Sequence, residues 1–189
     1  MANEFQERKT GSAYAFWNKL TLRDALYLGF CAVFIVITRA ALRLHLSVPG
    51  HAMFFTIFFL VLGRACVPGT GAASLVGFVA GLLSMLLGMG KGGPLAVLKF
   101  VLPGLVVDAG GIVCPQFSAS YAACIGVGAI ASATRFITFF LVDWLIGMEQ
   151  EVILQHVIIA SAMNTLFGAL GAALIPSIVR RLKIHQLIP

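Results

Sequence analysis

A few ionisable and amide side chains interrupt long apolar stretches of this sequence, and these are the residues most able to bind a ligand. The basic and amide candidates are Arg39, His51, Lys99, Arg135, His156 and Asn164, and the acids in the same stretches are Asp108 and Asp143. Placing such groups in an apolar environment costs several kcal/mol unless each meets a partner or a wet cavity. We therefore expect the basic and amide residues to form a substrate-binding site.

Cations outnumber acids among these candidates, which indicates the chemistry of the ligand. The cations within the apolar stretches are Arg39, Lys99 and Arg135. Because an arginine fork engages two acceptor atoms at once, a carboxylate, a phosphate or a polarised heterocycle would complete the site. We predict a small water-soluble ligand clamped by Arg39 or Arg135, oriented by Asn164 and covered by the connection around His51. The alternative is that Arg39 extends to lipid headgroups and Arg135 pairs with Asp143, which leaves a neutral ligand.

Asp108 belongs to a different part of the predicted bundle. It follows Pro94 by 14 residues, or about 21 Å of helix. It also follows Lys99 by nine residues, which places the two side chains on opposite faces of one helix. Arg64 is the predicted partner instead. We favour an ion pair over a proton or cation pathway, because one acid on one helix does not make a relay.

Six apolar stretches must position these residues. They cover residues 24–44, 51–67, 72–88, 94–114, 119–144 and 151–176, with Gly, Pro or charged residues at the breaks. The 189-residue chain is 60% hydrophobic and 11% charged, whereas soluble domains are about 45–50% apolar and about 25% charged. The predicted fold class is an all-α integral membrane protein, a six-transmembrane-helix bundle. With six helices in 189 residues, we expect no built-in ATPase.

The distribution of Lys and Arg predicts how the bundle is oriented. The cations near the predicted inner ends are Arg8, Lys9, Lys19, Arg23, Arg64, Arg180, Arg181 and Lys183. Because positively charged loops stay in the cytoplasm, both termini are predicted to be cytoplasmic. We expect a multi-pass protein of the cell membrane. Residues 1–23 would form a cytoplasmic and interfacial segment, 24–176 the substrate-binding transmembrane domain and 177–189 a basic cytoplasmic tail.

Small residues recur at helical spacing in several stretches, which is how helices approach one another closely in lipid. The stripes are Ala25, Gly29 and Ala32 in the first stretch; Ala73, Gly77, Gly81, Ser84 and Gly88 in the third; and Ala160, Asn164, Gly168 and Gly171 in the sixth. We expect most of them to pack within the chain. The first stripe lies near the cytoplasmic side, where a membrane partner could dock.

Several other chemistries have no support in the sequence. The four cysteines Cys31, Cys66, Cys114 and Cys124 form no CxxC pair and have no nearby His, so neither a metal nor a redox site is expected. The sequence has no HExxH or GxSxG motif, so we predict no catalytic residues and no cofactor. The formal net charge of +6 rests on few charged residues, which disfavours a nucleic-acid partner.

Motifs spread over nearly the whole chain resemble a family of transport proteins. They are the entry Leu20-Thr21-Leu22-Arg23-Asp24, the pair Ala25 and Gly29, the run Leu60 to Arg64, Gly71-Ala72, Gly77 to Gly81, Gly92-Gly93-Pro94 and Pro103-Gly104. Together with the short six-helix chain and the polar outer half, they resemble the substrate-binding S components of energy-coupling factor (ECF) transporters, a type of ABC transporter.

This resemblance implies a non-catalytic subunit that captures a vitamin or related micronutrient at the outer face. Import would be driven by ATP through a coupling transmembrane subunit and two ATPase subunits. The resemblance also implies that Ala25 and Gly29, with Ala32 one turn on, dock the coupling subunit. Gly29 departs from the alanine of the family motif. The nickel and cobalt branch is disfavoured, because Met1-Ala2-Asn3-Glu4 lacks the histidine of its metal loop.

Two other classes of membrane protein stay open. A stand-alone secondary transporter or channel would need a polar pathway through both halves, but the inner half offers little beyond Asp108. A structural assembly subunit would explain the small-residue stripes but not Arg39, Lys99 and Arg135.

Overall fold

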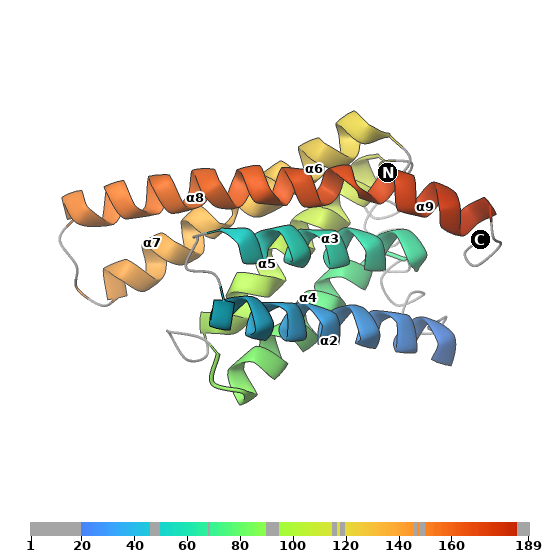
Figure 1. The fold of residues 1–189 in the computed structure, drawn as a ribbon, viewed down its shortest axis with the longest axis horizontal. Coiled ribbons are helices and arrows are strands. Elements are labelled where there is room, and N and C mark those ends of the chain that lie inside the picture. The colour runs from blue at the N-terminus through green and yellow to red at the C-terminus, as the bar shows by residue number, and fades with distance from the viewer. Residues whose placement is uncertain are drawn as a thin grey trace, which may run out of the picture.

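The computed structural model describes residues 20–45, 50–67, 69–89, 95–114, 117, 120–145, 147 and 150–184. Within these ranges the regular structure is entirely helical (Figure 1). The helices are α2 (Leu22–His45), α3 (His51–Cys66), α4 (Ala72–Leu86), α5 (Leu95–Val113), α6 (Tyr121–Ala133), α7 (Arg135–Leu145), α8 (Gln150–Ala173) and α9 (Ile175–Ile184). Single residues separate α6 from α7 and α8 from α9, so these eight segments form six rods.

Three of these rods are long and apolar enough to cross a membrane. They are Leu22–Leu42, Tyr121–Leu145 and Leu154–Leu182, with mean hydropathies of 2.1, 1.8 and 1.8. The apolar helices α3 and α4 are shorter. The 16 residues of α3 rise about 24 Å, less than a hydrocarbon core of about 30 Å. The all-helical class is therefore confirmed within the described residues, and three helices are long and apolar enough to cross a membrane, while the number of spans stays a prediction.

Glycine and proline set the helix boundaries at the predicted breaks. Gly50 precedes α3 with φ +98°, and Gly71 precedes α4 with φ +111°, a backbone conformation that residues with a Cβ rarely adopt. Pro176 cannot donate a hydrogen bond to the carbonyl of Ala172, so the last rod breaks there. The helix then continues to Ile184, eight residues beyond the predicted end of the sixth stretch.

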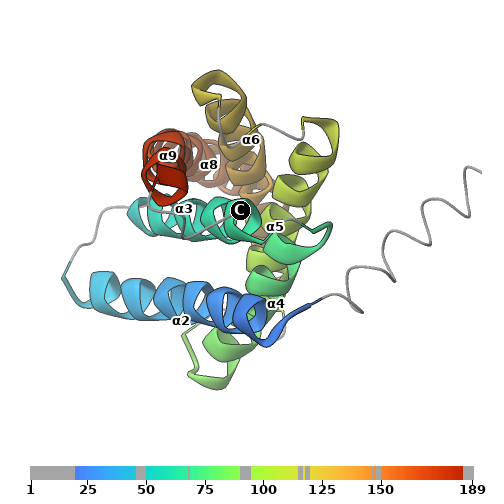
Figure 2. The same ribbon diagram turned by 90° about the vertical axis from the view of Figure 1, so that its right-hand side faces the viewer.

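Helix α3 occupies the centre of the bundle. Figure 2 shows α2 on one side of it, α4 and α5 on another, and α6 and α8 on a third. Its inward residues Met53, Ile57 and Leu60 are buried. On α2, in contrast, Phe30 is 62% exposed and Ile37 is 54% exposed. An exposed face this apolar is suited to lipid rather than water.

Glycines allow the closest approaches between helices. A Cβ on Gly104 of α5 would lie 2.7 Å from the carbonyl oxygen of Ala73, and one on Gly81 of α4 would lie 2.9 Å from Cα of Val97. On α8, Gly168 likewise lies against Ser132 of α6. The stripe of the sixth stretch and that of the third up to Ser84 therefore pack within the chain, as predicted, whereas Gly88 is exposed beyond the end of α4 with nothing near it.

Candidate functional site

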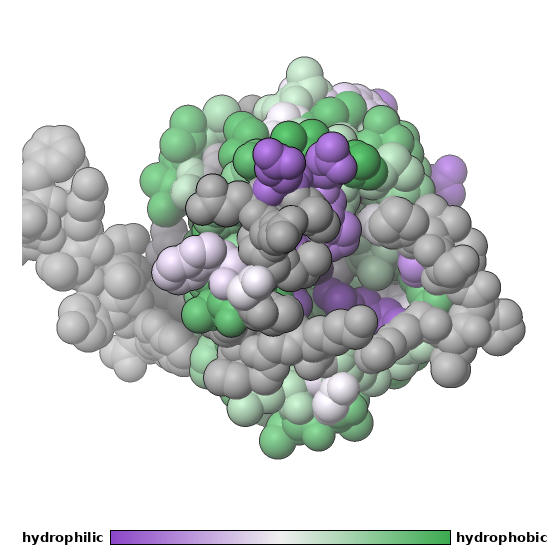
Figure 3. All heavy atoms as spheres, turned by 90° about the vertical axis from the view of Figure 1, so that its left-hand side faces the viewer, coloured by the Kyte–Doolittle hydropathy of each residue, from purple (hydrophilic) through white to green (hydrophobic). Residues whose placement is uncertain are grey.

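The residues predicted to form a site come from several helix ends on one side of the bundle. These are the last turns of α2 and the start of α3 and α8, at the left of Figure 1, together with α7 and the first turns of α5. Figure 3 shows this end face on: hydrophilic side chains are visible in its upper and middle parts, between residues drawn in grey, and hydrophobic ones lie mainly above and below them. Hydrophilic side chains are thus present at this end of an otherwise apolar bundle.

Three cations from three helices are close enough to interact electrostatically at this end of the bundle. Lys99 of α5 interacts electrostatically with Arg39 of α2 and with Arg135 of α7. It also interacts with Asp143, farther along α7. The two arginines lie close enough to repel each other. The structure therefore brings together residues that are 36 to 96 positions apart in the sequence. We call Arg39, Lys99 and Arg135 the cationic cluster.

Arg135 is the most deeply buried member of the cationic cluster. It begins α7, directly after the break at Thr134, whose hydroxyl donates to the carbonyl of Ala131 at 2.6 Å. Only 5% of Arg135 is exposed. Its Cζ lies 5.9 Å from the centre of the Phe139 ring, and its buried Nε has no hydrogen-bond acceptor among the described residues. A buried guanidinium of this kind has donor capacity to offer a ligand.

Arg39 rests on a second aromatic ring. Its Cζ lies 4.7 Å from the centre of the Phe100 ring, which is itself buried. Phe100 is fixed by the close approach of its backbone to Gly77 of α4. A cation over an aromatic face is attracted by the negative charge of the ring, so this contact stabilises the Arg39 guanidinium at its buried position.

Asp143 contacts a histidine rather than an arginine. Its Oδ2 lies 3.1 Å from Nδ1 of His156, whose side chain is 58% exposed. No hydrogen bond or ion pair in the described part of the chain joins Arg135 to Asp143, so the alternative pairing predicted from the sequence is wrong. Eight residues of helix separate them by about 12 Å along the axis, too far for a direct contact. No group of three or more His, Cys, Asp or Glu that could hold a metal ion occurs among the described residues.

Asn164 lies deeper than His156, eight residues farther along α8. It is 6% exposed, and its Nδ2 donates to the carbonyl of Ala160 at 2.6 Å. The start of α3 packs against it, since a Cβ on Gly50 would lie 3.2 Å from the backbone nitrogen of Asn164. His51, half-buried, follows Gly50 directly. The structure therefore brings the His51 end of α3 to Asn164, and the predicted ligand contact of this amide stays a prediction.

The opposite end of α5 carries a second buried charge pair. Oδ1 of Asp108 lies 3.5 Å from Nε of Arg64, which confirms the predicted pairing. The same carboxylate accepts hydrogen bonds from the backbone N–H of Ala73 at 3.2 Å and of Ser74 at 2.8 Å, in the first turn of α4. Gly111 makes room for the guanidinium. Asp108 thus ties α3, α4 and α5 together and neutralises the positive end of α4.

The three residues predicted to dock a partner differ in exposure. Ala25 is exposed, and Gly29 is half-buried with no atom within 4 Å of the position where a Cβ would stand. Ala32, one turn on, is completely buried against the bundle. Only Ala25 and Gly29 are therefore accessible to another protein in this structure.

Sequence reasoning missed the aromatic support of the two arginines. Phe139 follows Arg135 by four residues, a spacing that places both side chains on one helix face, so this contact could have been predicted from the sequence. Phe100 and Arg39 are on different helices, and nothing local in the sequence relates them.

The chain was compared with known proteins at the level of sequence families, single sequences and folds. No family model, no curated protein and no solved structure matches it.

Proposed function

We propose that this chain is the membrane-embedded substrate-binding subunit of an importer similar to ECF transporters. It would cross the cell membrane six times with both termini in the cytoplasm, and capture a small water-soluble micronutrient at the outer face. A coupling transmembrane subunit and two ATPase subunits would drive import. The observation that carries the proposal is the convergence of Arg39, Lys99 and Arg135 inside one end of an apolar bundle.

The cost of this convergence supports a binding role. Like charges repel more strongly where water is scarce, and burying a cation costs several kcal/mol. Only 5% of the Arg135 surface is exposed, and the Arg39 guanidinium repels it. A packing role would be filled at lower cost by an apolar side chain of similar size. A solute that completes the site accounts for the charges, whereas a structural assembly subunit does not.

The apolar middle of the bundle favours a binding subunit over a channel or a stand-alone transporter. On α3, Ile57, Leu60 and Val61 are fully buried between His51 at one end and Arg64 at the other. On α5, Val107 is fully buried next to Asp108. These side chains separate the cationic cluster from the Arg64–Asp108 pair. A subunit that opens to one side and relies on partners for translocation fits this arrangement.

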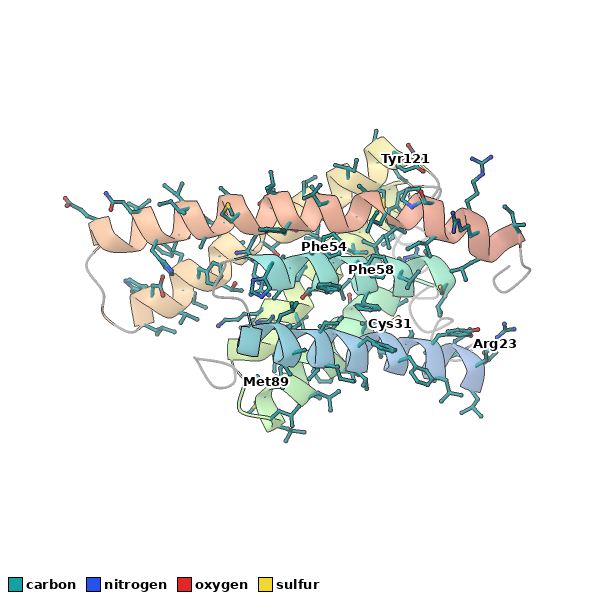
Figure 4. All side chains as sticks on the ribbon, in the orientation of Figure 1. Arg23, Cys31, Phe54, Phe58, Met89 and Tyr121 are labelled. Carbon is teal, nitrogen blue, oxygen red and sulfur yellow. The ribbon has the colours of Figure 1, made fainter. Side chains whose placement is uncertain are left out.

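The charges at the far end support the proposed orientation. Arg180 and Arg181 are exposed on α9, and Arg23 is exposed at the start of α2. Figure 4 shows Arg23 at the right-hand end, opposite the end that carries the cationic cluster. Exposed cations gather on the cytoplasmic side of membrane proteins, so the cluster would face outward.

Co-purification from the native membrane tests this function. The tagged chain is extracted under mild conditions, and its protein partners and bound small molecules are identified by mass spectrometry. The proposal predicts a membrane protein with two ATPases and a water-soluble metabolite, all missing from a mock preparation without the tag. Recovery of the chain as a monomer with neither partners nor solute, from cells that take up the micronutrient, would contradict it.

A further inference from the structure

The last helix, α9, has two faces of opposite character. Its buried face packs against the hydrophobic core through Ile175, Val179 and Leu182. Its exposed face is formed by residues three or four positions apart, a spacing that places side chains on one side of a helix. We call these residues the basic face; they are Ser177, Arg180, Arg181 and Ile184. The helix is thus held by the bundle on one side and presents two arginines on the other.

The arginines of the basic face have no acidic neighbour among the described residues. The helices that pack against α9 are α3, α6 and α8. Neither α3 nor α6 contains Asp or Glu, and the acid of α8, Glu151, lies in its first turn. From Glu151 to Arg180 the chain covers about 44 Å of helix, several Debye lengths at physiological salt. In the described part of the chain, no ion pair engages the guanidinium of Arg180 or of Arg181.

The length of the last rod places the basic face at a membrane surface. The apolar span from Leu154 to Leu182 has 29 residues, or about 44 Å of helix, whereas a hydrocarbon core is about 30 Å thick. A core that begins at Leu154 ends about 20 residues later, at Leu174, where α8 gives way to α9. Figure 1 shows α9 continuing the rod of α8 at this end. Arg180 lies about 9 Å beyond Leu174, at the level of the lipid headgroups.

A tyrosine from another helix marks the same level. Tyr121 begins α6 and is 54% exposed, and its hydroxyl lies 2.8 Å from Oγ of Ser177 on the basic face. Tyrosine is enriched where hydrocarbon meets headgroups, because its ring is apolar and its hydroxyl is polar. Ile184, which is 70% exposed, adds an apolar side chain to the same face. A face that combines exposed cations with an exposed apolar group suits the headgroup layer rather than water.

We propose that the basic face of α9 binds the headgroup of an anionic phospholipid. Arg180 and Arg181 are the donors, and the acceptors are the oxygens of the lipid phosphodiester, which match the guanidinium fork. A zwitterionic headgroup contains the same phosphodiester but offsets its charge with a cation of its own. Anionic lipids are concentrated in the cytoplasmic leaflet, the side proposed for both termini. The inference requires that the chain crosses a membrane, but not that it is an importer.

Thermal unfolding of the full chain in dodecyl maltoside micelles tests the lipid class. The probes are phosphatidylglycerol, phosphatidylcholine with the same acyl chains, and inorganic phosphate, each titrated at constant ionic strength. A ligand that binds only the folded state raises the melting temperature in a saturable way. We expect a rise of several degrees with phosphatidylglycerol and a smaller one with phosphatidylcholine. Inorganic phosphate should give none, because it lacks the acyl chains that hold a lipid at this level.

Variants of the exposed arginines locate the response. Arg180→Gln combined with Arg181→Gln should weaken the apparent affinity for phosphatidylglycerol about fivefold for each arginine removed. Arg180→Lys combined with Arg181→Lys keeps both charges and should keep most of the affinity. The control for net charge is Glu151→Gln, exposed at the start of α8, which should leave the affinity unchanged. Circular dichroism checks each fold, and Arg181→Gln alone decides the result if the double Gln variant does not fold.

Three results would overturn the proposal. They are equal stabilisation by phosphatidylglycerol and phosphatidylcholine, equal stabilisation by inorganic phosphate, and wild-type affinity for phosphatidylglycerol in the folded double Gln variant. The other occupant that this face suits is an acidic surface of a protein partner. Loss of a co-purifying protein in the double Gln variant, with an unchanged response to phosphatidylglycerol, would assign the basic face to that partner instead.

Discussion

Nδ1 of His156 lies 3.1 Å from Oδ2 of Asp143, so an exposed histidine on α8 engages a carboxylate that also interacts electrostatically with Lys99. The contact joins the last turns of α7 to the first turns of α8. Arg135, two turns earlier on α7, is too far from Asp143 for a direct contact, and its buried Nε has no hydrogen-bond acceptor among the described residues. This unsatisfied donor is what makes Arg135 the centre of the proposed site.

Replacing Arg135 should stabilise the empty protein. Arg135→Met keeps the length of the side chain but removes a buried cation that is repelled by Arg39. We expect the free energy of unfolding without ligand to rise by about 1–4 kcal/mol, the range seen when well-packed apolar residues replace buried ion pairs. Denaturant unfolding in detergent micelles measures it.

The matched control is the buried arginine that has a partner. Arg64→Met leaves Asp108 without its guanidinium, so the free energy of unfolding should fall by about 3–5 kcal/mol. Opposite signs for the two variants support the distinction between a site arginine and a structural one. Destabilisation by Arg135→Met as large as by Arg64→Met would show that Arg135 is structural.

Two glycines with different surroundings test the packing of α4 against α5. A Cβ on Gly104 would lie 2.7 Å from the carbonyl oxygen of Ala73, whereas one on Gly126 would meet no atom within 4 Å. Gly104→Ala should lower the free energy of unfolding by about 1–3 kcal/mol, because backbone must move. Gly126→Ala should leave it unchanged or raise it, since Ala favours helix. Equal stability of both variants would show that the two helices are not in close contact.

The helix boundaries were predictable because their causes are local. Apolar runs and the breaks at Gly50 and Gly71 are visible in the sequence, and the helices from α2 to α7 begin and end within a few residues of their predicted stretches, except for the break between α6 and α7. The last helix was predicted too short, since Arg180 and Arg181 reduce hydropathy without ending a helix. Hydropathy reports the lipid-facing part of a rod rather than its full length.

The pairing of Asp108 with Arg64 was predictable from the sequence, but the other contacts of Asp108 were not. Arg64 and Asp108 pair as predicted, because both were placed at the same depth on neighbouring helices. The hydrogen bonds that the backbone N–H groups of Ala73 and Ser74 donate to Asp108 were not predicted, because these residues lie 35 and 34 positions away in the sequence. Such contacts depend on helix rotation, which the broad apolar surfaces of these helices do not specify.

The open space beside Gly29 leads to a prediction about assembly. Ala25→Trp combined with Gly29→Leu should leave the fold intact, because Ala25 is exposed and nothing lies within 4 Å of a Cβ on Gly29. If this surface docks the coupling subunit, the double variant should lose co-purification and energised uptake but keep ligand binding. Uptake assays in cells and binding assays on the purified chain measure the two effects.

The lipid-facing side of the same helix supplies the control for assembly. Ile37→Trp changes a residue that is 54% exposed on α2 and should leave uptake unchanged. Wild-type uptake by the Ala25 and Gly29 double variant would remove this surface as the docking site.

Topology is a separate prediction of the proposed function. Both termini should report a cytoplasmic location in reporter fusions, and Lys91 and Glu149 should lie in outer connections, because exposed cations such as Arg180 and Arg181 mark the inner side. Cysteines introduced at positions 91 and 149 would be labelled by membrane-impermeant reagents added to intact cells. An external terminus would reverse the placement of the cationic cluster.

The central claim is that a solute binds among Arg39, Lys99 and Arg135, and calorimetric titration with the co-purifying solute tests it most directly. Wild type is compared with Arg39→Gln, Arg135→Gln and Asn164→Ala, each first shown to be folded by circular dichroism. The account predicts that Kd rises about tenfold or more in the arginine variants. Wild-type affinity in all three folded variants would contradict it.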